Sequence, residues 1–337
     1  MANLQRNTLQ GVVEITKRPT MFLRDTFFRN TVLFDTEKVE LDVDIEVRAM
    51  AEYTGRGQMS KAVFKDAFKT NTFIPPFISL SQALNEKDFM NRRPGQTEYQ
   101  TSAMSAKDWA TARAISKMDR MISLREEYQA MECLFNGQVT VGSNTISFDR
   151  DASLSVTLTG VNLWDQSTAD PYENFLEWRD LIAEKSGQTP TDIILGSDAW
   201  KNLRSHAGFI ALLDKLNIRI GSIEPVQAAP GVFRVMQLPE IGNFWTYPEK
   251  YVDPSTGTTN SLIPANKIAY VARNAEQTRY YGGVPVATDM GIDVVASDRV
   301  MDIDIQKDPA QELIIMKSAP LMAITTANAV LSAVVAP

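Results

Sequence analysis

Residues 39–48 read Val-Glu-Leu-Asp-Val-Asp-Ile-Glu-Val-Arg, so apolar and charged side chains alternate at every position. This strict period of two predicts a β-strand with one buried face and one charged face. The charged face carries Glu40, Asp42, Asp44, Glu46 and Arg48. A strand built in this way needs a second surface against which its apolar face can pack.

A turn follows the strand at Gly55-Arg56-Gly57, where two glycines permit positive φ. Apolar residues then return between Val63 and Phe73, and residues 37–75 are predicted to form one long hairpin. A lone two-stranded hairpin is marginally stable in water. It is therefore expected to lean on another surface, either of its own chain or of a neighbour.

The hairpin ends at residues 72–80, Thr-Phe-Ile-Pro-Pro-Phe-Ile-Ser-Leu, which place Pro75 and Pro76 inside an apolar run. Both prolines lack the N–H donor, so the pair is excluded from a helix interior and from a central strand. The apolar flanks still favour burial. We expect a short, stiff, extended segment where the hairpin rejoins the body.

A long helix is predicted over about residues 105–135. Ser105 is a candidate N-cap, and Asn136-Gly137 ends the pattern. Its apolar stripe follows spacings of three and four, with Met121 and Leu124 widening it; the stripe consists of Ile115, Met118, Ile122, Arg125, Tyr128, Met131 and Phe135. At 1.5 Å per residue the helix is roughly 45 Å long.

The remaining patterns alternate between strands and helices, which predicts an α+β chain. We expect a hairpin within 138–160, followed by an amphipathic helix at 171–186 with Pro171 at its start and Gly187 past its end. A buried strand at 190–195 and a helical stretch at 198–216 come next. Short strands and loops follow at 218–286, and further strands lie within 296–305 and 312–316.

Composition limits the class of protein. The 337 residues are 44% hydrophobic and 22% charged, as in soluble globular chains, and the net charge of -7 argues against bulk nucleic-acid binding. The single cysteine, Cys133, excludes an internal disulfide, favours a reducing compartment and is expected in the core near a helix end. The N-terminus lacks the apolar region of a secretory signal.

The two ends of the chain differ in charge. Residues 1–36 are expected to form an arm with net positive charge, including Arg24 and Arg29, whereas the segment from Val286 onward is acidic. This suits an arm that lies across another copy of the chain, although two unrelated solvated faces explain it equally well. Residues 318–337 carry no charge; a membrane span is disfavoured by Pro320 and several polar residues, so we expect packed strand or coil.

Few residues offer chemistry. One histidine, His206, excludes multi-histidine metal sites, and it is expected to border a helix. Asp302 and Asp304 share a face of a predicted strand, where a solvated face is favoured over acid–base work. No cofactor or metal is expected. A chain with few reactive groups and several extended elements points to a structural subunit that assembles with copies of itself.

Several blocks resemble one family in the same order along nearly the whole chain. They are the hairpin sequence VELDVDIEVRAMAEYTGRG, FKTNTFIPPFIS, NRRPG before the long helix, PTDIILGSDAWKNL, YPEKYVDPSTGTTNSLIPANKIAYVA and QKDPAQELIIMKSAPLMAI. This ordered set is similar to the major capsid proteins of lambda-like tailed phages. The hairpin tip, RAMAEYTGRGQ, is more polar than the family pattern.

The resemblance implies the Hong Kong 97-type fold of tailed-phage shells, with an arm at 1–36, an extended loop at 37–75, a peripheral domain at 76–186 with a spine helix, an axial domain at 187–290, and a return to the peripheral domain at 291–337. It implies hexamers and pentamers in an icosahedral shell around double-stranded DNA, without sequence-specific binding or enzymatic activity.

Further expectations follow from the same resemblance. The implied location is the virion, with assembly in the host cytoplasm. Partners would be copies of the chain, a scaffold, a portal and a decoration protein at three-fold positions, with no membrane. The intersubunit contacts are expected at Arg24, Arg29, Glu40, Asp42, Asp44, Glu46, Arg48, Gly55, Arg56, Gly57, Pro75 and Pro76.

Two alternatives stay open. The first is the shell of a cargo-enclosing nanocompartment with the same fold, which differs in holding an enzyme rather than DNA. The second is an enzyme that uses Asp302 and Asp304 in a pocket of the inserted domain, and the lack of histidine and cysteine clusters argues against it.

Overall fold

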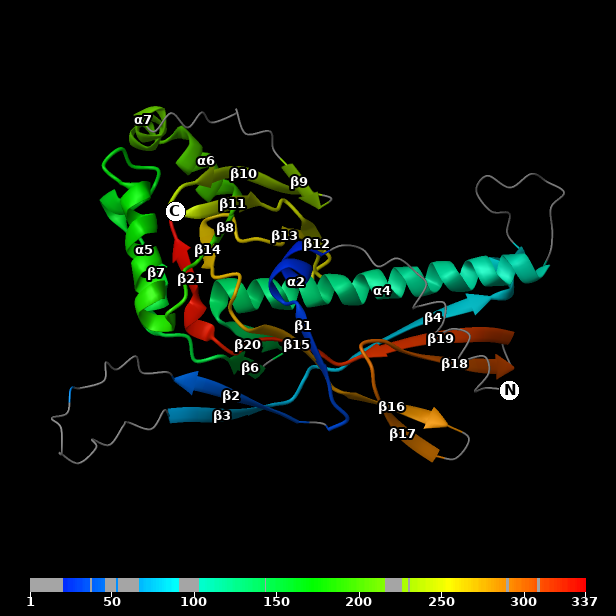
Figure 1. Ribbon diagram of the computed structural model, residues 1–337. Coiled ribbons are helices and arrows are strands. Elements are labelled where there is room, and N and C mark those ends of the chain that lie inside the picture. Colours follow the sequence, from blue (N-terminus) through cyan, green and yellow to red (C-terminus); the bar gives the residue numbers. More distant parts are fainter. Residues whose placement is uncertain are drawn as a thin grey trace.

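The computed structural model describes residues 21–36, 38–45, 53, 67–90, 103–142, 144–215, 226–229, 231–288, 291–307 and 310–337. Figure 1 shows one long helix crossing the molecule, with a sheet and three helices at one end and smaller sheets beneath it. The α-helices are α2 Phe22–Phe27, α3 Glu86–Met90, α4 Ala103–Asn136, α5 Pro171–Ser186, α6 Ser197–Ser205 and α7 Ala207–Lys215.

The crossing helix is α4, which confirms the helix predicted over 105–135. Ile115, Met118 and Ile122 are almost completely buried, as the predicted stripe requires. The helix ends where Gly137 adopts φ +66°, a conformation that glycine accepts without strain. Met121, expected to widen the buried stripe, is 51% exposed, and Arg125, predicted within the stripe, is exposed as well, because the buried face turns instead toward Asp119, Ser123 and Glu126.

The largest sheet has seven strands in the order β7-β21-β14-β8-β11-β10-β9. Its strands are β7 Ser155–Thr157, β8 Asp192–Leu195, β9 Val226–Ala229, β10 Val232–Leu238, β11 Gly242–Thr246, β14 Lys267–Val271 and β21 Val330–Val334. β8 is parallel to β11 and antiparallel to β14, which in turn pairs with β21. The sheet therefore takes β7 and β21 from outside the axial domain expected at 187–290.

Helix α5 covers this sheet and matches the predicted bounds of 171–186. The Asp170 side chain accepts hydrogen bonds from the amides of Tyr172 and Glu173, and Gly187 closes the helix in a left-handed conformation. Its inner face contributes Phe175 and Trp178 to a core shared with α6, α7 and β21. The helical stretch predicted at 198–216 is two helices, divided at His206.

Two three-stranded sheets pack against α4. The first has the order β18-β19-β4 and buries Met301, Ile314 and Met316 against the N-terminal half of the helix. The second has the order β1-β15-β20 and packs, with α2, on its C-terminal half. The strands are β1 Asn30–Leu33, β4 Ile78–Asn85, β15 Gln277–Tyr281, β18 Val300–Lys307, β19 Ala310–Ser318 and β20 Pro320–Ile324.

Four two-stranded sheets complete the part of the chain that the structure describes: β2 Val39–Ile45 with β3 Ala67–Phe73, β5 Gln138–Val141 with β6 Asn144–Ser147, β12 Lys250–Val252 with β13 Thr259–Ser261, and β16 Gly283–Thr288 with β17 Gly291–Ala296. Three short 3-10 turns lie at Ala152–Leu154, Gly160–Asn162 and Ala327–Ala329.

The uncharged C-terminal segment forms β20 and β21, both almost wholly buried, which confirms the expectation of packed strand. Among the helices that the structure describes, none has both the length and the apolar character needed to cross a bilayer.

Candidate assembly site at the base of the hairpin

The predicted hairpin is present as β2 and β3, which pair antiparallel from Val39 opposite Phe73 to Ile45 opposite Ala67. Figure 1 shows both strands running out from the body side by side. Val39 is buried, and the Phe73 ring lies 5.9 Å from that of Phe148, so the base of the hairpin belongs to the core around α4. The base is therefore held firmly while the strands extend outward.

The proline segment lies at this base. Pro75 is buried, and Pro76 is partly buried. The Pro75 ring and the Phe34 ring both lie over Gly282, between β15 and β16: a Cβ at Gly282 would be 3.4 Å from Pro75 Cγ and 3.5 Å from Phe34 Cε2. The Phe34 amide also donates to the Tyr281 carbonyl at 3.1 Å. Both chain segments that enter the hairpin thus contact one short connection.

Gly283 is the tightest point of this junction. A Cβ there would lie 2.7 Å from the carbonyl oxygen and 3.0 Å from the carbonyl carbon of Asp35. Only a residue without a side chain permits this backbone approach. The pair Gly282-Gly283 therefore brings the segment that leads into β2 against the start of β16.

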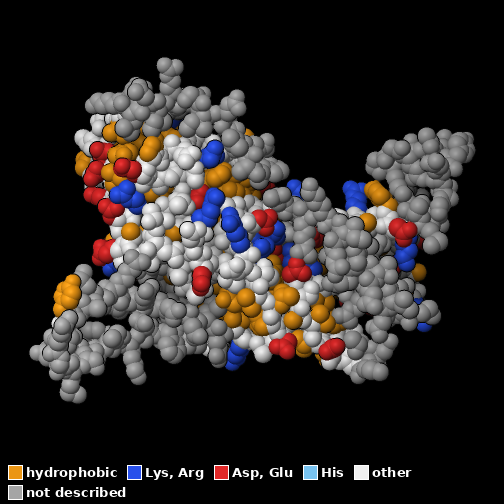
Figure 2. All heavy atoms as spheres, viewed as in Figure 1, with side chains coloured by type: hydrophobic (Ala, Val, Ile, Leu, Met, Phe, Trp, Pro, Cys, Tyr) orange, Lys and Arg blue, Asp and Glu red, His pale blue; other side chains and the backbone are white. Residues whose placement is uncertain are grey.

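Apolar side chains remain exposed around the base. The exposed apolar residues of β1 and of the proline segment are Val32, Leu33, Ile74 and Phe77, each 43–54% exposed. Figure 2 shows apolar side chains gathered in this part of the molecule, below the middle of the view. Exposed apolar patches of this kind commonly mark protein interaction sites.

The structure separates the predicted contact residues. Glu40, Asp42 and Asp44 lie on β2, and Arg29 is exposed with its Nε donating to the Thr26 carbonyl at 3.0 Å. Pro75 and Pro76 lie at the hairpin base. The others fall outside the described residues: Glu46, Arg48, Gly55, Arg56 and Gly57.

Arg24 is buried within its own chain and does not form the surface contact that was expected. It is 5% exposed, and its Nη1 lies 2.8 Å from Glu126 Oε2 in α4. Burial alone would lower the pKa of Arg24, but the carboxylates of Asp25 and Glu126 raise it overall. Arg24 therefore fastens helix α2 to α4 within its own chain.

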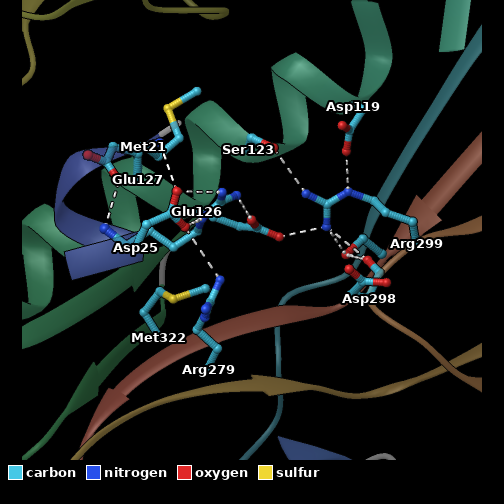
Figure 3. Close-up of polar contacts among 12 residues, drawn as sticks. Met21, Asp25, Asp119, Ser123, Glu126, Glu127, Arg279, Asp298, Arg299 and Met322 are labelled. Carbon is cyan, nitrogen blue, oxygen red and sulfur yellow. Dashed lines mark hydrogen bonds and ion pairs between the residues drawn. The ribbon is translucent and has the colours of Figure 1, made fainter. Parts of the chain in front are cut away.

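The ion pair belongs to a buried cluster that joins three parts of the chain (Figure 3). Arg299, which precedes β18, donates from Nε to Asp119 at 2.8 Å and from Nη1 to Glu126 at 2.7 Å. Burial would raise the pKa of Glu126, but Arg299 and Arg24 lower it overall. Glu126 thus remains ionised between two arginines, one from α2 and one from the β18 segment.

Glu127 binds the start of α2. Its carboxylate accepts the amide of Leu23 at 2.7 Å and that of Arg24 at 2.9 Å. Burial raises the pKa of Glu127 to about 7, although these two hydrogen bonds and the charge of Arg24 act to lower it. Asp25 and the Tyr247 hydroxyl also lie beside it.

Sequence reasoning missed this cluster, although the sequence contains a signal for it. Asp119, Ser123 and Glu126 follow the spacings of three and four that define one face of α4. Polar residues on a face adjoining an apolar stripe are usually assigned to solvent. Here the partner arginine is 180 residues away from Asp119, so its burial could not be inferred locally.

The residues considered for chemistry have packing roles. His206 borders α6, where Nδ1 accepts the Phe209 amide at 3.3 Å and Nε2 lies 3.1 Å from the Gln166 carbonyl. Cys133 is fully buried near the end of α4, as predicted, and burial raises its pKa. Within the described part of the chain no three histidine, cysteine or carboxylate side chains are grouped to hold a metal ion.

Asp302 and Asp304 lie on β18, in the sheet under α4, and not in the inserted domain where the enzyme hypothesis places them. A groove of about 480 Å³ opens beside α4, lined mainly by apolar residues that include Phe77, Met121 and Tyr251. Neither aspartate lines it.

Comparison with known proteins gives a consistent result. The family described as phage major capsid protein E matches residues 5–335. The chain is 24% identical to the major capsid protein of Enterobacteria phage P21, over 95% of each chain, and 24% identical to that of Escherichia phage lambda, over 90% of each.

Solved structures agree on the fold. A prophage capsid protein of E. coli CFT073 superimposes with a TM-score of 0.72 at 16% identity, covering 98% of this chain and 99% of that one. A phage-related protein of Bordetella bronchiseptica RB50 gives a TM-score of 0.60 at 12% identity, covering 97% and 96%.

Proposed function

The chain belongs to the phage major capsid protein E family, and we propose that it assembles as hexamers and pentamers whose β2–β3 hairpins reach onto neighbouring copies. As a major capsid protein it forms the capsid of the virion and has the Hong Kong 97-type fold of the phage shells. Membership of the family does not itself establish the assembly into hexamers and pentamers or the contacts of the hairpin, and these are what we propose.

The observation that carries the proposal is the contrast between the two ends of the hairpin. Its base is fixed by Val39, Phe73 and Pro75 in the core of its own chain. Its strands then extend from the body, and β2 carries alternating acidic and apolar residues in the sequence. An extended pair of strands recovers its ordering cost by burying area, and a neighbouring copy supplies that area.

The exposed apolar residues at the base favour the same arrangement. Val32 and Leu33 lie on β1 and Ile74 and Phe77 flank the proline pair, so a neighbour that contacts the hairpin can also cover them. Arg29 lies three residues before Val32 and is exposed, which leaves it available for an ion pair across the interface. Arg24 is not part of this surface, because its charge is used within the chain.

The proposed role is structural rather than catalytic. His206 and Cys133 are occupied in packing, and Asp302 and Asp304 lie on a sheet strand away from the groove. The shell would enclose double-stranded DNA without reading its sequence. A scaffold and a portal during assembly, and a decoration protein at three-fold positions, complete the proposal on the basis of family resemblance.

Electron microscopy of the protein expressed with and without a candidate scaffold tests the proposal. The wild type should form closed shells or free hexamers and pentamers. A variant lacking residues 50–60 should keep its thermal unfolding temperature but form no shells. A charge reversal on β2, Asp42→Lys with Asp44→Lys, should likewise reduce shell formation while the thermal unfolding temperature stays unchanged.

The control reverses two exposed charges on α5, Glu177→Lys with Glu184→Lys, which are not part of the hairpin. Normal shells from the deletion variant would reject the hairpin contact. A wild-type protein that stays monomeric with every scaffold would reject shell formation itself. Particles filled with an enzyme and free of DNA would favour a nanocompartment.

A further inference from the structure

The charges of α4 are separated between its two sides. All its acidic residues after Asp108 are buried: Asp119, Glu126, Glu127 and Glu132. All its basic residues beyond Lys107 are exposed: Arg113, Lys117, Arg120 and Arg125. Lys107 itself is paired with Glu312 at 2.7 Å. Arg113, Lys117 and Arg120 follow spacings of four and three and therefore share one side of the helix, whereas Arg125 lies roughly 120° further round it, beside the groove. We call Arg113, Lys117 and Arg120 the cationic face of α4.

The inward acids have partners that explain them. Asp119 and Glu126 bind Arg299, and Glu127 binds the start of α2. The cationic face has no such partners: in the part of the chain that the structure describes, none of its three side chains forms an ion pair with a carboxylate. Arg125 differs, because its charge acts to lower the pKa of Glu132 and of Asp253. Arg113 lies over the Trp109 ring at 5.2 Å and Arg125 over the Tyr128 ring at 5.6 Å, which restrains both guanidinium groups while leaving them exposed.

The cationic face is unusual for this chain. The protein carries a net charge of -7, so four exposed cations on one helix are not a consequence of a basic composition. The cationic face runs from Arg113 to Arg120, seven residues of an α-helix or about 10 Å. Duplex DNA presents one phosphate charge per about 1.7 Å of axis, so roughly six phosphates lie along that length.

We propose that the cationic face of α4 lines the interior of the shell and contacts the phosphates of the enclosed DNA. This rests on the proposed function, in which the shell encloses double-stranded DNA. The contact is independent of sequence, because arginine and lysine on phosphates set position and affinity but read no bases. The cations lie in a line along a straight helix rather than around a pocket, which fits a linear polyanion.

Binding of unassembled protein to a 30-base-pair duplex tests the proposal. The probe variant is Arg113→Gln, Lys117→Gln, Arg120→Gln, and the affinity is measured from low to moderate salt. Each lost phosphate contact lowers the slope of log affinity against log salt by about 0.9, so the triple variant should lose about 2.7 of the slope. Arg113→Lys with Arg120→Lys should retain it, because both charges remain.

The control variant is Lys201→Gln, Arg204→Gln, Lys250→Gln, which removes three exposed cations from elsewhere in the chain. Equal slopes for the probe and control variants would overturn the proposal. It would also be overturned by intact, empty wild-type shells that bind added duplex on their outside through these residues. Binding of a polyglutamate peptide but not of duplex would reject DNA as the partner of the cationic face. It would indicate an acidic protein segment instead, and such a segment could also contact the apolar groove beside Arg125.

Shell formation is scored separately by electron microscopy. Failure of the wild type to form shells would reject the proposed function, whereas normal shells with an unchanged salt slope would reject only the DNA contact.

Discussion

Arg299 Nη1 lies 2.7 Å from Glu126 Oε1, and both side chains are almost fully buried. Their bond joins the segment before β18 to the middle of α4, while the second oxygen of Glu126 holds Arg24 of α2. Glu126 therefore connects the N-terminal helix, the long helix and the sheet under it. A buried carboxylate between two arginines costs desolvation, and it is stable only while both partners are present.

Replacing Arg299 with methionine should strongly destabilise the protein. The substitution removes the guanidinium that both Asp119 and Glu126 bind, and breaking a buried pair from one side costs about 3–5 kcal/mol. Chemical denaturation of the unassembled protein measures the loss. Arg179→Met is the matched control, because Arg179 pairs with the exposed Asp180; exposed pairs contribute less than about 1 kcal/mol. Equal losses in both variants would contradict this account of the cluster.

The pH dependence of stability should contain a contribution from Glu127. Its pKa is about 7 when folded against 4.5 for an ordinary glutamate, so the folded state holds the proton more tightly. This favours folding at low pH, and the stabilisation is lost as pH rises from about 4.5 to 7. Glu127→Gln removes the titration, so its melting temperature relative to wild type should rise between pH 5 and 8.

Calorimetry at several pH values would follow this difference. Glu184→Gln controls for the loss of one negative charge, since Glu184 is exposed on α5. A difference between Glu127→Gln and wild type that stays constant across the range, or falls with pH, would show that Glu127 is not the titrating group.

Local patterns in the sequence predicted the elements whose signals are local. Helix α5 was predicted with its bounds, because Pro171 and Gly187 mark its ends and Phe175 and Trp178 mark its inner face. The β2–β3 hairpin followed from the alternation in β2, the two glycines after it and the apolar residues that return before the proline pair. The pairing of strands within the sheets could not be predicted in the same way. β21 pairs with β14, more than fifty residues earlier, and nothing in the sequence of either strand specifies that partner.

The candidate site shows the same limit. The proline pair indicated a stiff base for the hairpin, but its contact with Gly282 depends on a segment 200 residues away. Arg24 was assigned to an intersubunit contact because it belongs to the positively charged N-terminal arm, whereas its actual partner Glu126 lies about a hundred residues away in α4.

Two methionines on α4 test the orientation of the helix. Met118 is 3% exposed in the core formed with β18 and β19, whereas Met121, one turn away, is 51% exposed. Met118→Asp buries an unpaired charge and should prevent folding. Met121→Asp should change the melting temperature by only a few degrees. Circular dichroism of both variants measures the outcome, and Met118→Leu should remain close to wild type, within about 1.5 kcal/mol. Wild-type stability in Met118→Asp would show that the buried face is wrongly assigned.

Gly283 should control the direction in which the hairpin leaves the body. A Cβ at this position meets the Asp35 carbonyl group at 2.7–3.0 Å, and a backbone group cannot move aside as a flexible side chain can. Gly283→Ala should therefore displace the segment before β2 and reduce shell yield while the rest of the fold persists.

Gly282→Ala is the matched control: its Cβ would make ordinary contacts of 3.4–3.5 Å with Pro75, Ala319 and Phe34, so its shells should form normally. Shell yields from electron microscopy and melting temperatures, measured for both variants, separate a misdirected hairpin from general instability. If Gly283→Ala assembles as efficiently as Gly282→Ala, the close approach to Asp35 does not set the hairpin direction.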